Sequence, residues 1–160
     1  MQDKEKEFEL LTELYGGIIS KVCFFYSSDA EHYKDLRQEV LANLWKGFDG
    51  FRGSAKVSTW IYRVSLNSCI SFHRKHERNM NVTSIDEMTE LVDPTVDRPE
   101  LLREMYRLIN LLGKIEKAVI LLWLDERSYD EISEVTGLPR NTVASKLHRI
   151  KDKLTRLANE

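Results

Sequence analysis

The residues with the clearest chemical potential are the basic and amide side chains near the end of this 160-residue chain. After Pro139, apolar residues recur every three or four positions as far as Leu157, which predicts one helix with an apolar face. The rest of its surface would carry Arg140, Asn141, Thr142, Ser145, Lys146, Arg149 and Lys153. Residues 137–160 hold six basic and two acidic residues, a charge of plus four. Such groups suit base edges and phosphates, which is a chemistry of binding.

A turn and a shorter helix would position this basic surface. The pattern predicts a helix over residues 129–136, a break at Gly137-Leu138-Pro139 and the longer helix to about residue 157, which is the layout of a helix-turn-helix. Gly137 suits a turn that needs positive φ, and Pro139 suits the first helical position. An amphipathic helix that ends a bundle would show the same period, but the glycine turn favours the helix-turn-helix.

A second polar surface is predicted in the first half of the chain. An apolar helix pattern over residues 36–48 leaves Asp35, Gln38, Glu39 and Asn43 opposite its apolar face. The next segment mixes aromatic, basic and amide side chains: Phe51, Arg52, Lys56, Trp60, Tyr62, Arg63 and Asn67, followed by Arg74 and Lys75. This mixture offers stacking surfaces and phosphate contacts to unpaired nucleic acid. A solvated face is the alternative for the first group, and Trp60 and Tyr62 also suit a core, which we favour for Trp60.

The remaining periodicity predicts an all-α fold of two small domains. Helix patterns cover residues 8–22, 36–48, 58–78, 101–112 and 115–123, and no alternating run bounded by hairpin turns predicts a strand. Residues 79–100 contain Pro94 and Pro99 and have a net charge of minus five, which indicates a linker. The expected domains are therefore residues 1–78 and 101–160, joined by the acidic segment 79–100.

Composition argues against several classes of function. Cys23 and Cys69 have no close partner spacing, so a disulfide framework or a zinc site is not expected, and His73 and His76 lack a further ligand nearby. We expect no metal and no cofactor. The chain shows no phosphate loop, nucleophile motif or carboxylate cluster with metal spacing, which argues against an enzyme. Without an export or membrane-spanning pattern, a cytoplasmic protein with no small-molecule substrate is expected.

Four motifs, in order and at compatible spacing, resemble one family. They are Asp35-Leu36 with Gln38-Glu39-Val40 and Leu44-Trp45; Phe51-Arg52-Gly53; Thr59-Trp60, Tyr62-Arg63 and Asn67; and Tyr129-Asp130-Glu131-Ile132 with Gly137, Thr142-Val143 and Leu147. Together they resemble the sigma-70 family of bacterial RNA polymerase sigma factors, in its extracytoplasmic-function (ECF, group 4) type. Residues 35–78 resemble region 2 of these proteins, and residues 101–157 resemble region 4.

The resemblance implies a non-enzymatic transcription initiation factor. Its partners would be core RNA polymerase, through the largest-subunit clamp helices and the flap, promoter DNA and an anti-sigma factor. The polymerase would then be bound by Asp35, Gln38, Glu39 and Asn43. The minus-10 element would be read and melted by the residues from Phe51 to Lys75 named above. The minus-35 element would be read by the basic helix. Ser65, Ser68 and Ser71 depart from the usual family pattern. A stand-alone helix-turn-helix regulator, with an N-terminal effector or dimerisation domain, is the alternative.

Overall fold

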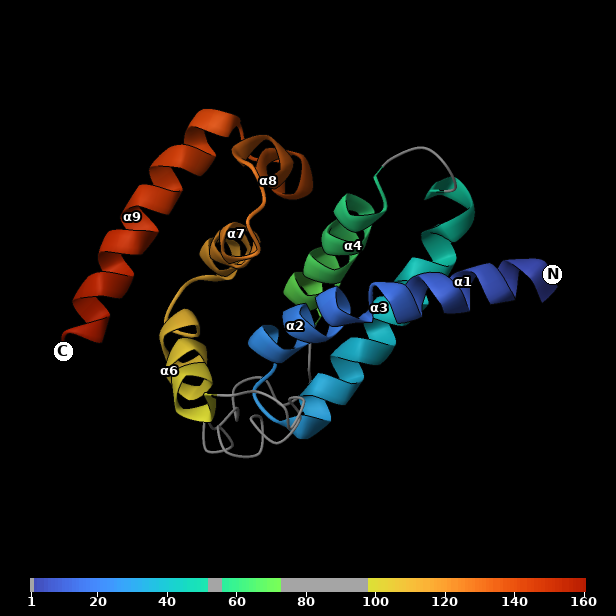
Figure 1. Ribbon diagram of the computed structural model, residues 1–160, viewed down its shortest axis with the longest axis horizontal. Coiled ribbons are helices and arrows are strands. Elements are labelled where there is room, and N and C mark those ends of the chain that lie inside the picture. The colour runs from blue at the N-terminus through green and yellow to red at the C-terminus, as the bar shows by residue number, and fades with distance from the viewer. Residues whose placement is uncertain (1, 52–55, 73–97) are drawn as a thin grey trace. The chain divides into compact units, whose positions relative to one another are not determined.

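The computed structural model describes residues 2–51, 56–72 and 98–160, and within these ranges the chain forms helices and no strand (Figure 1). The predicted all-α class is therefore confirmed. The chain divides into two compact units, Met1–Met80 and Asn81–Glu160, which are described separately below. No helix in the described ranges has the length and apolar character that a membrane span requires.

Unit 1 contains α1 (Gln2–Leu14), α2 (Gly16–Tyr26), α3 (Ala30–Phe51) and α4 (Val57–Ser71). The single helix predicted over residues 8–22 is wrong, because the chain breaks at Tyr15, where ψ is 15°, and restarts at Gly16. Two adjacent glycines, Gly16 and Gly17, weaken a continuous helix at this point. Leu14 ends α1 and is 77% exposed instead of joining the predicted apolar face.

The helix predicted over residues 36–48 is longer in the structure: α3 begins at Ala30 and continues through Gly47 and Gly50 to Phe51. Phe48 and Phe51 are both buried, so packing of this last turn outweighs the low helix propensity of the glycines. The third predicted helix, over residues 58–78, is shorter: α4 ends at Ser71, because Phe72 takes an extended conformation with ψ 122°. The rest of that prediction, from residue 73, lies outside the described residues.

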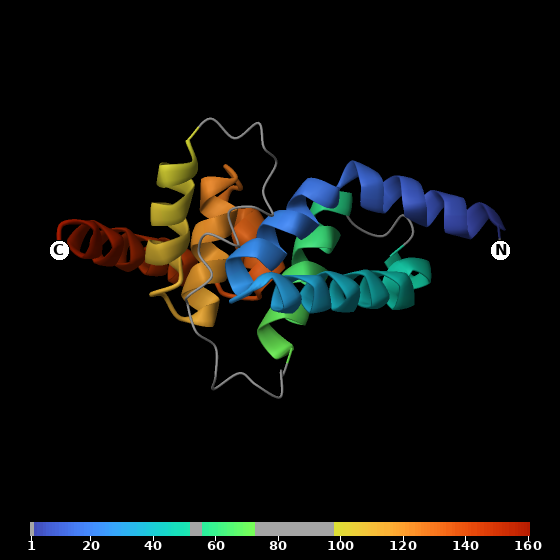
Figure 2. The same ribbon diagram turned by 90° about the horizontal axis from the view of Figure 1, so that it is seen from below.

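The core of unit 1 lies where α4 packs against both α2 and α3, an arrangement visible in Figures 1 and 2. Its fully buried aliphatic side chains come from all three helices: Ile19, Val22, Leu36, Val40, Leu44 and Ile61. Each such side chain stabilises the fold by roughly 1.5–3 kcal/mol through removal from water. The N-terminal α1 adds Phe8, whose ring meets Trp45 and Phe48 edge-on with centroids 5.1 and 5.4 Å away.

Unit 2 contains α6 (Pro99–Ile109), α7 (Lys114–Leu124), α8 (Tyr129–Thr136) and α9 (Arg140–Ala158). α7 packs against α8 and α9, and α6 packs against α9. The core is aliphatic, with Val119, Leu122, Ile132, Val143, Leu147 and Ile150 fully or almost fully buried. Pro139 is the residue before α9 and not its first helical residue, because its ψ of 148° is extended.

Most of the predicted linker, residues 79–97, lies outside the described residues. The helix α6 begins at Pro99, within the last two residues of the predicted linker.

Candidate nucleic-acid interface

The turn between α8 and α9 is closed by its own hydrogen bonds. Gly137 takes the left-handed conformation, with φ 79°, and its N–H donates to the Ser133 carbonyl at 2.8 Å. The Ser133 hydroxyl donates to the Leu138 carbonyl at 2.6 Å, and the Leu138 N–H donates to Thr136 Oγ1 at 3.3 Å. At the other end of α8, Ser128 Oγ accepts from the Glu131 N–H at 3.1 Å, as a helix N-cap does. These bonds fix the direction in which α9 leaves the turn.

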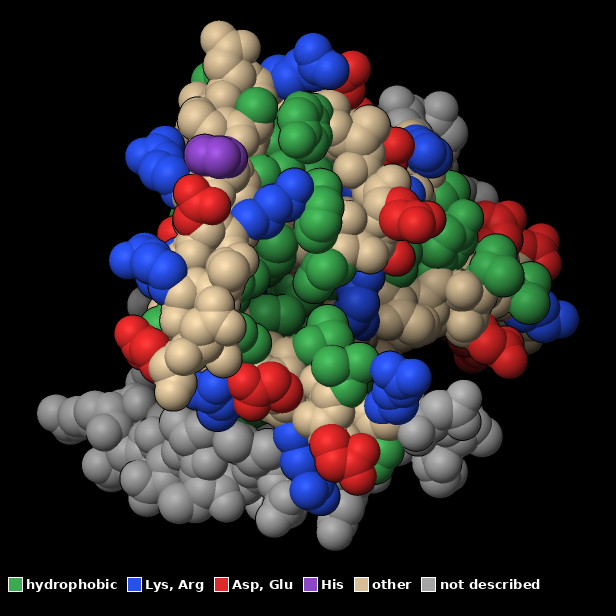
Figure 3. All heavy atoms as spheres, turned by 60° about the vertical axis from the view of Figure 1, so that its left-hand side comes forward, with side chains coloured by type: hydrophobic (Ala, Val, Ile, Leu, Met, Phe, Trp, Pro, Cys, Tyr) green, Lys and Arg blue, Asp and Glu red, His purple; other side chains and the backbone are tan. Residues whose placement is uncertain are grey.

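The helix α9 has a buried aliphatic side and an accessible polar side. Val143, Leu147 and Ile150 are buried against the rest of unit 2. Of the predicted binding residues, Arg140, Asn141, Ser145 and Arg149 are exposed, whereas Thr142, Lys146 and Lys153 are half-buried. Figure 3 shows basic side chains along the exposed side, interspersed with acidic ones. The structure therefore brings all seven residues to one helix and leaves their side of it accessible, as predicted from the periodicity.

The middle of this surface is tied to the backbone of its own helix. The Ser145 hydroxyl donates to the Asn141 carbonyl at 2.9 Å, and Arg149 Nε donates to the Ser145 carbonyl at 3.3 Å. These local bonds hold the stem of the Arg149 guanidinium along the helix. The surface is thus partly ordered without a ligand, which lowers the entropy lost when a ligand binds.

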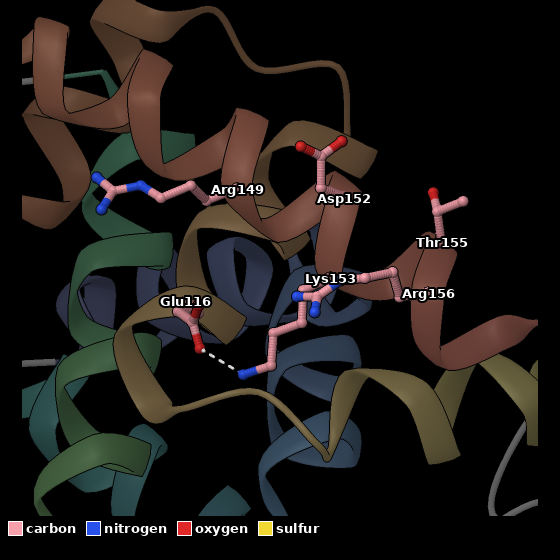
Figure 4. A pocket seen from close by; sticks show the side chains of 6 residues that line it. All are labelled: Glu116, Arg149, Asp152, Lys153, Thr155 and Arg156. Carbon is pink, nitrogen blue, oxygen red and sulfur yellow. Dashed lines mark hydrogen bonds and ion pairs between the residues drawn. The ribbon is translucent and has the colours of Figure 1, made fainter. Parts of the chain in front are cut away.

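A hollow of about 590 Å³ lies beside the second half of α9, between that helix and the start of α7. Lys153 Nζ reaches across it to Glu116 Oε1 at 3.5 Å, while the side chains of Asp152 and Thr155 point away from Glu116 (Figure 4). Glu116 also accepts a hydrogen bond from the Gly113 N–H at 3.0 Å. This backbone bond, helped by the charges of Lys153 and Lys146, holds the pKa of Glu116 below its usual range.

Sequence reasoning missed two acidic residues that contact this surface. Glu116 stands three positions after Gly113, a spacing typical of a helix N-terminus, so the capping pattern could have revealed it. Asp130 forms an ion pair with Arg140, in which Arg140 Nε lies 3.0 Å from Asp130 Oδ1. Ten residues and a turn separate these two, so no helical period in the sequence could have paired them.

The predicted polar surface of unit 1 lies on α3. Gln38 and Glu39 are exposed, and Asp35 is half-buried. Asn43 has a partner within the unit, because its Nδ2 donates to Ser68 Oγ of α4 at 2.9 Å. Ser68 therefore has a structural role, because it links α4 to α3.

The aromatic residues predicted to contact unpaired bases are buried in unit 1. Phe51 stacks on Trp60 with ring centroids 4.3 Å apart and planes 12° apart, and each side chain is 8% exposed. Tyr62 is 1% exposed, and its hydroxyl accepts from Lys21 Nζ. The preference for Trp60 as a core residue agrees with this burial. Contact of these three rings with DNA stays a prediction.

The polar members of the same predicted group are more accessible. Lys56 and Asn67 are exposed and Arg63 is half-buried, on or next to α4. Arg52, Arg74 and Lys75 lie outside the described residues. Within residues 2–51, 56–72 and 98–160, no group of three His, Cys, Asp or Glu side chains is placed to hold a metal ion.

The fold and these surfaces define a helical protein with a helix-turn-helix in one unit and a separate three-helix core in the other. Sequence comparison places each unit in a known family: residues 11–79 match the model of sigma-70 region 2, and residues 102–154 match that of sigma-70 region 4. The chain belongs to the sigma-70 family of RNA polymerase sigma factors, in its ECF group. It is therefore a transcription initiation factor, as the motifs predicted, and the stand-alone regulator is not favoured.

Known relatives match over nearly their whole length. The RNA polymerase sigma factor YlaC of Bacillus subtilis is 27% identical over 159 residues, which cover 94% of this chain and 91% of the relative. The ECF RNA polymerase sigma-E factor of Haemophilus influenzae is also 27% identical, with 94% and 87% covered.

Two solved structures share the fold. The sigma factor RpoE, in complex with the anti-sigma factor NepR from Bartonella quintana, has a TM-score of 0.71 and 19% identity, and the match covers 99% of this chain and 98% of that one. CnrH, in complex with the cytosolic domain of CnrY, also has a TM-score of 0.71, with 20% identity and 97% and 89% covered.

Proposed function

We propose that this chain binds core RNA polymerase through α3 of unit 1 and directs it to promoters whose minus-10 element meets unit 1 and whose minus-35 element meets α9 of unit 2. The observation that carries the proposal is the division of α9 into a buried aliphatic side and an accessible side with basic and amide groups. A helix of 19 residues is about 28 Å long, enough to lie in a major groove while its other side stays packed.

Within α9, the first residues are expected to meet base edges and the later ones phosphates. Arg140, Asn141 and Thr142 lie in the first turn of the helix, and Ser145 and Lys146 lie in the next turn. Bidentate contacts of Arg with guanine or of Asn with adenine discriminate by about 1–3 kcal/mol each, so one or two are enough to select a promoter class. Arg149 and Lys153, further along, suit the DNA backbone.

On unit 1, the exposed polar groups of α3 bind the polymerase, and the polar groups on and next to α4 bind the DNA. Gln38 and Glu39 are accessible for contact with the clamp helices of the largest subunit, with Asp35 and Asn43 at the edge of this surface. Lys56, Arg63 and Asn67 are the accessible minus-10 residues in the described ranges, with Arg52, Arg74 and Lys75 proposed beside them. Phe51, Trp60 and Tyr62 support this surface from within the core, and any base contact by their rings needs them to turn outward.

The chain is proposed to lack catalytic chemistry of its own and to act in the cytoplasm, where core polymerase and DNA are found. The flap of the polymerase is the expected partner of unit 2. An anti-sigma factor is a further expected partner, because RpoE and CnrH were each determined in complex with a protein partner, NepR being named as an anti-sigma factor. Such a factor should compete with core polymerase for the chain in a fluorescence anisotropy titration.

The test is reconstitution. The purified chain is added to core RNA polymerase with a library of promoter fragments, and transcripts are sequenced. Promoter-specific starts that need both the chain and the core are expected. Core binding without specific starts, or specific duplex binding by the chain alone as a symmetric dimer, would contradict the proposal and favour a stand-alone regulator.

A further inference from the structure

The ion pair between Asp130 and Arg140 joins the first turn of α8 to the first residue of α9. Arg140 Nε lies 3.0 Å from Asp130 Oδ1, and the guanidinium carbon lies 6.0 Å from the centre of the Tyr129 ring. The side chains of Arg140 and Asp130 are 65% and 79% exposed. An ion pair this exposed contributes little to the stability of the fold, so stability does not account for the pairing of these two residues.

The placement of Arg140 is unfavourable for the helix itself. A helix N-terminus has a partial positive charge, which acidic residues stabilise and basic residues destabilise. α9 has no acidic residue in its first turn and begins with Arg140. α8 has the opposite arrangement, with Asp130 and Glu131 in its first turn. The carboxylate that offsets the charge of Arg140 therefore comes from the neighbouring helix, across the turn.

The geometry of the pair leaves the recognition edge of the guanidinium available. Asp130 is within reach of Nε, on one side of the planar group, while a bidentate contact with guanine or phosphate can use the terminal Nη1 and Nη2 pair. Because the ion pair at Nε favours some rotamers of Arg140 over others, this side chain has less conformational freedom to lose on binding, and its terminal edge points in a limited set of directions.

We propose that Asp130 is a positioning residue for promoter recognition: its carboxylate holds the Arg140 guanidinium so that the terminal edge reads one base pair of the minus-35 element. The inference rests on the function proposed above. Asp130 itself is not a base contact. The negative charge of Asp130 also repels DNA phosphates. Without this carboxylate, Arg140 would be free to contact the phosphate backbone of DNA in place of a base edge.

Four variants of the full chain, assembled with core polymerase, test the proposal: Asp130→Asn, Asp130→Glu, Arg140→Ala and the double variant that combines Asp130→Asn with Arg140→Ala. The readout is the base preference at each position of a randomised minus-35 segment, measured by sequencing transcripts from the library. Arg140→Ala should reduce the preference at one position about tenfold or more. Asp130→Asn should reduce it at the same position by about twofold to fivefold, with the other positions unchanged, and should add nothing in the Arg140→Ala background. Asp130→Glu should retain part of the preference, because it keeps the carboxylate.

A matched control is Glu126→Gln, which removes the same charge from an exposed residue in the loop before α8 and should leave the base preference unchanged. The proposal is overturned if Asp130→Asn leaves every preference intact, or if it weakens or strengthens use of all sequences equally, since the first means no positioning and the second a structural or general electrostatic role. Failure of the underlying function is distinguishable, because the unsubstituted chain would then select no sequence at all.

Discussion

Single side chains on α3 divide into those that face solvent and those that hold the unit together. Glu39 and Asn43 differ in this way although they are one helical turn apart: Glu39 is exposed, while Asn43 donates to Ser68 on α4. Sequence pattern grouped them as one polar surface, because periodicity gives the face of a residue but not the hydrogen bonds that its side chain forms.

Substitutions at these two positions should therefore have different effects. Glu39→Lys is expected to weaken binding to core polymerase about tenfold and to change the free energy of unfolding by less than about 0.5 kcal/mol, as for other exposed positions. Asn43→Ala should lower the free energy of unfolding by about 1 kcal/mol through loss of the Ser68 bond. Surface plasmon resonance with immobilised core and urea unfolding give the two readouts. Core affinity that survives Glu39→Lys would contradict the assignment of this face.

Lys153 is proposed to bind a DNA phosphate, and its internal ion pair with Glu116 would compete with that contact. Lys153→Ala should weaken holoenzyme binding to all promoter sequences alike and reduce the slope of log K against log salt by about 1, the value for one lost phosphate contact. The measurement is a filter-binding titration at several salt concentrations. An unchanged slope would mean that Lys153 stays with Glu116 at 3.5 Å in the complex.

At the scale of elements, the turn before α9 depends on one backbone conformation. Gly137→Ala should lower the free energy of unfolding by about 1–2 kcal/mol, because alanine disfavours the left-handed region. The cause is the φ of 79° alone, since a Cβ at this position would meet no atom within 4 Å. Thermal unfolding followed by circular dichroism measures the loss.

Gly17→Ala is the matched control for that substitution. Gly17 also has open space around its Cβ position, but it lies inside α2 with no positive φ. Alanine there should stabilise the chain by about 0.5–1 kcal/mol. Equal effects of the two substitutions would contradict a conformational cause at Gly137.

The start of α7 should make the stability of unit 2 sensitive to acid. The folded state lowers the pKa of Glu116, so its contribution is present above the pKa of the unfolded chain, near 4.5, and is lost as pH falls through the lower folded value. Glu116→Gln should therefore cost about 0.5–1 kcal/mol at pH 7, by loss of the charged cap and of a solvent-screened ion pair, and almost nothing at pH 2. Urea unfolding at both pH values measures this.

Helix identity was easier to predict than helix ends. The period of three and four residues located α3, α4, α7, α8 and α9, and the glycine at position 137 located the turn. The break at Tyr15 was missed although Gly16 and Gly17 were a local signal for it. The continuation of α3 from residue 48 to Phe51 was missed because it depends on the burial of Phe51, which a local pattern does not contain. The pair of Asp130 and Arg140 was missed because a local pattern does not contain it either.

For the whole molecule, the net charge did not indicate a DNA-binding protein, whereas the distribution of charge along the chain did. The chain has a net charge of minus two, yet residues 137–160 have plus four. This local excess is modest, so the chain alone should bind duplex DNA weakly and with little discrimination. Most of the affinity for a promoter would come from the polymerase that unit 1 is proposed to bind, and α9 would determine which promoter sequences are selected.

The separation of the two sides of α9 has a consequence for how such proteins diversify. The buried residues Val143, Leu147 and Ile150 and the hydrogen bonds of the turn contain none of the proposed base contacts. The accessible side can therefore change by mutation while the folded domain keeps its stability. A duplicated copy of this gene could acquire a new set of target promoters through a few substitutions at positions such as Arg140 and Asn141, and both copies would still fold and share one polymerase.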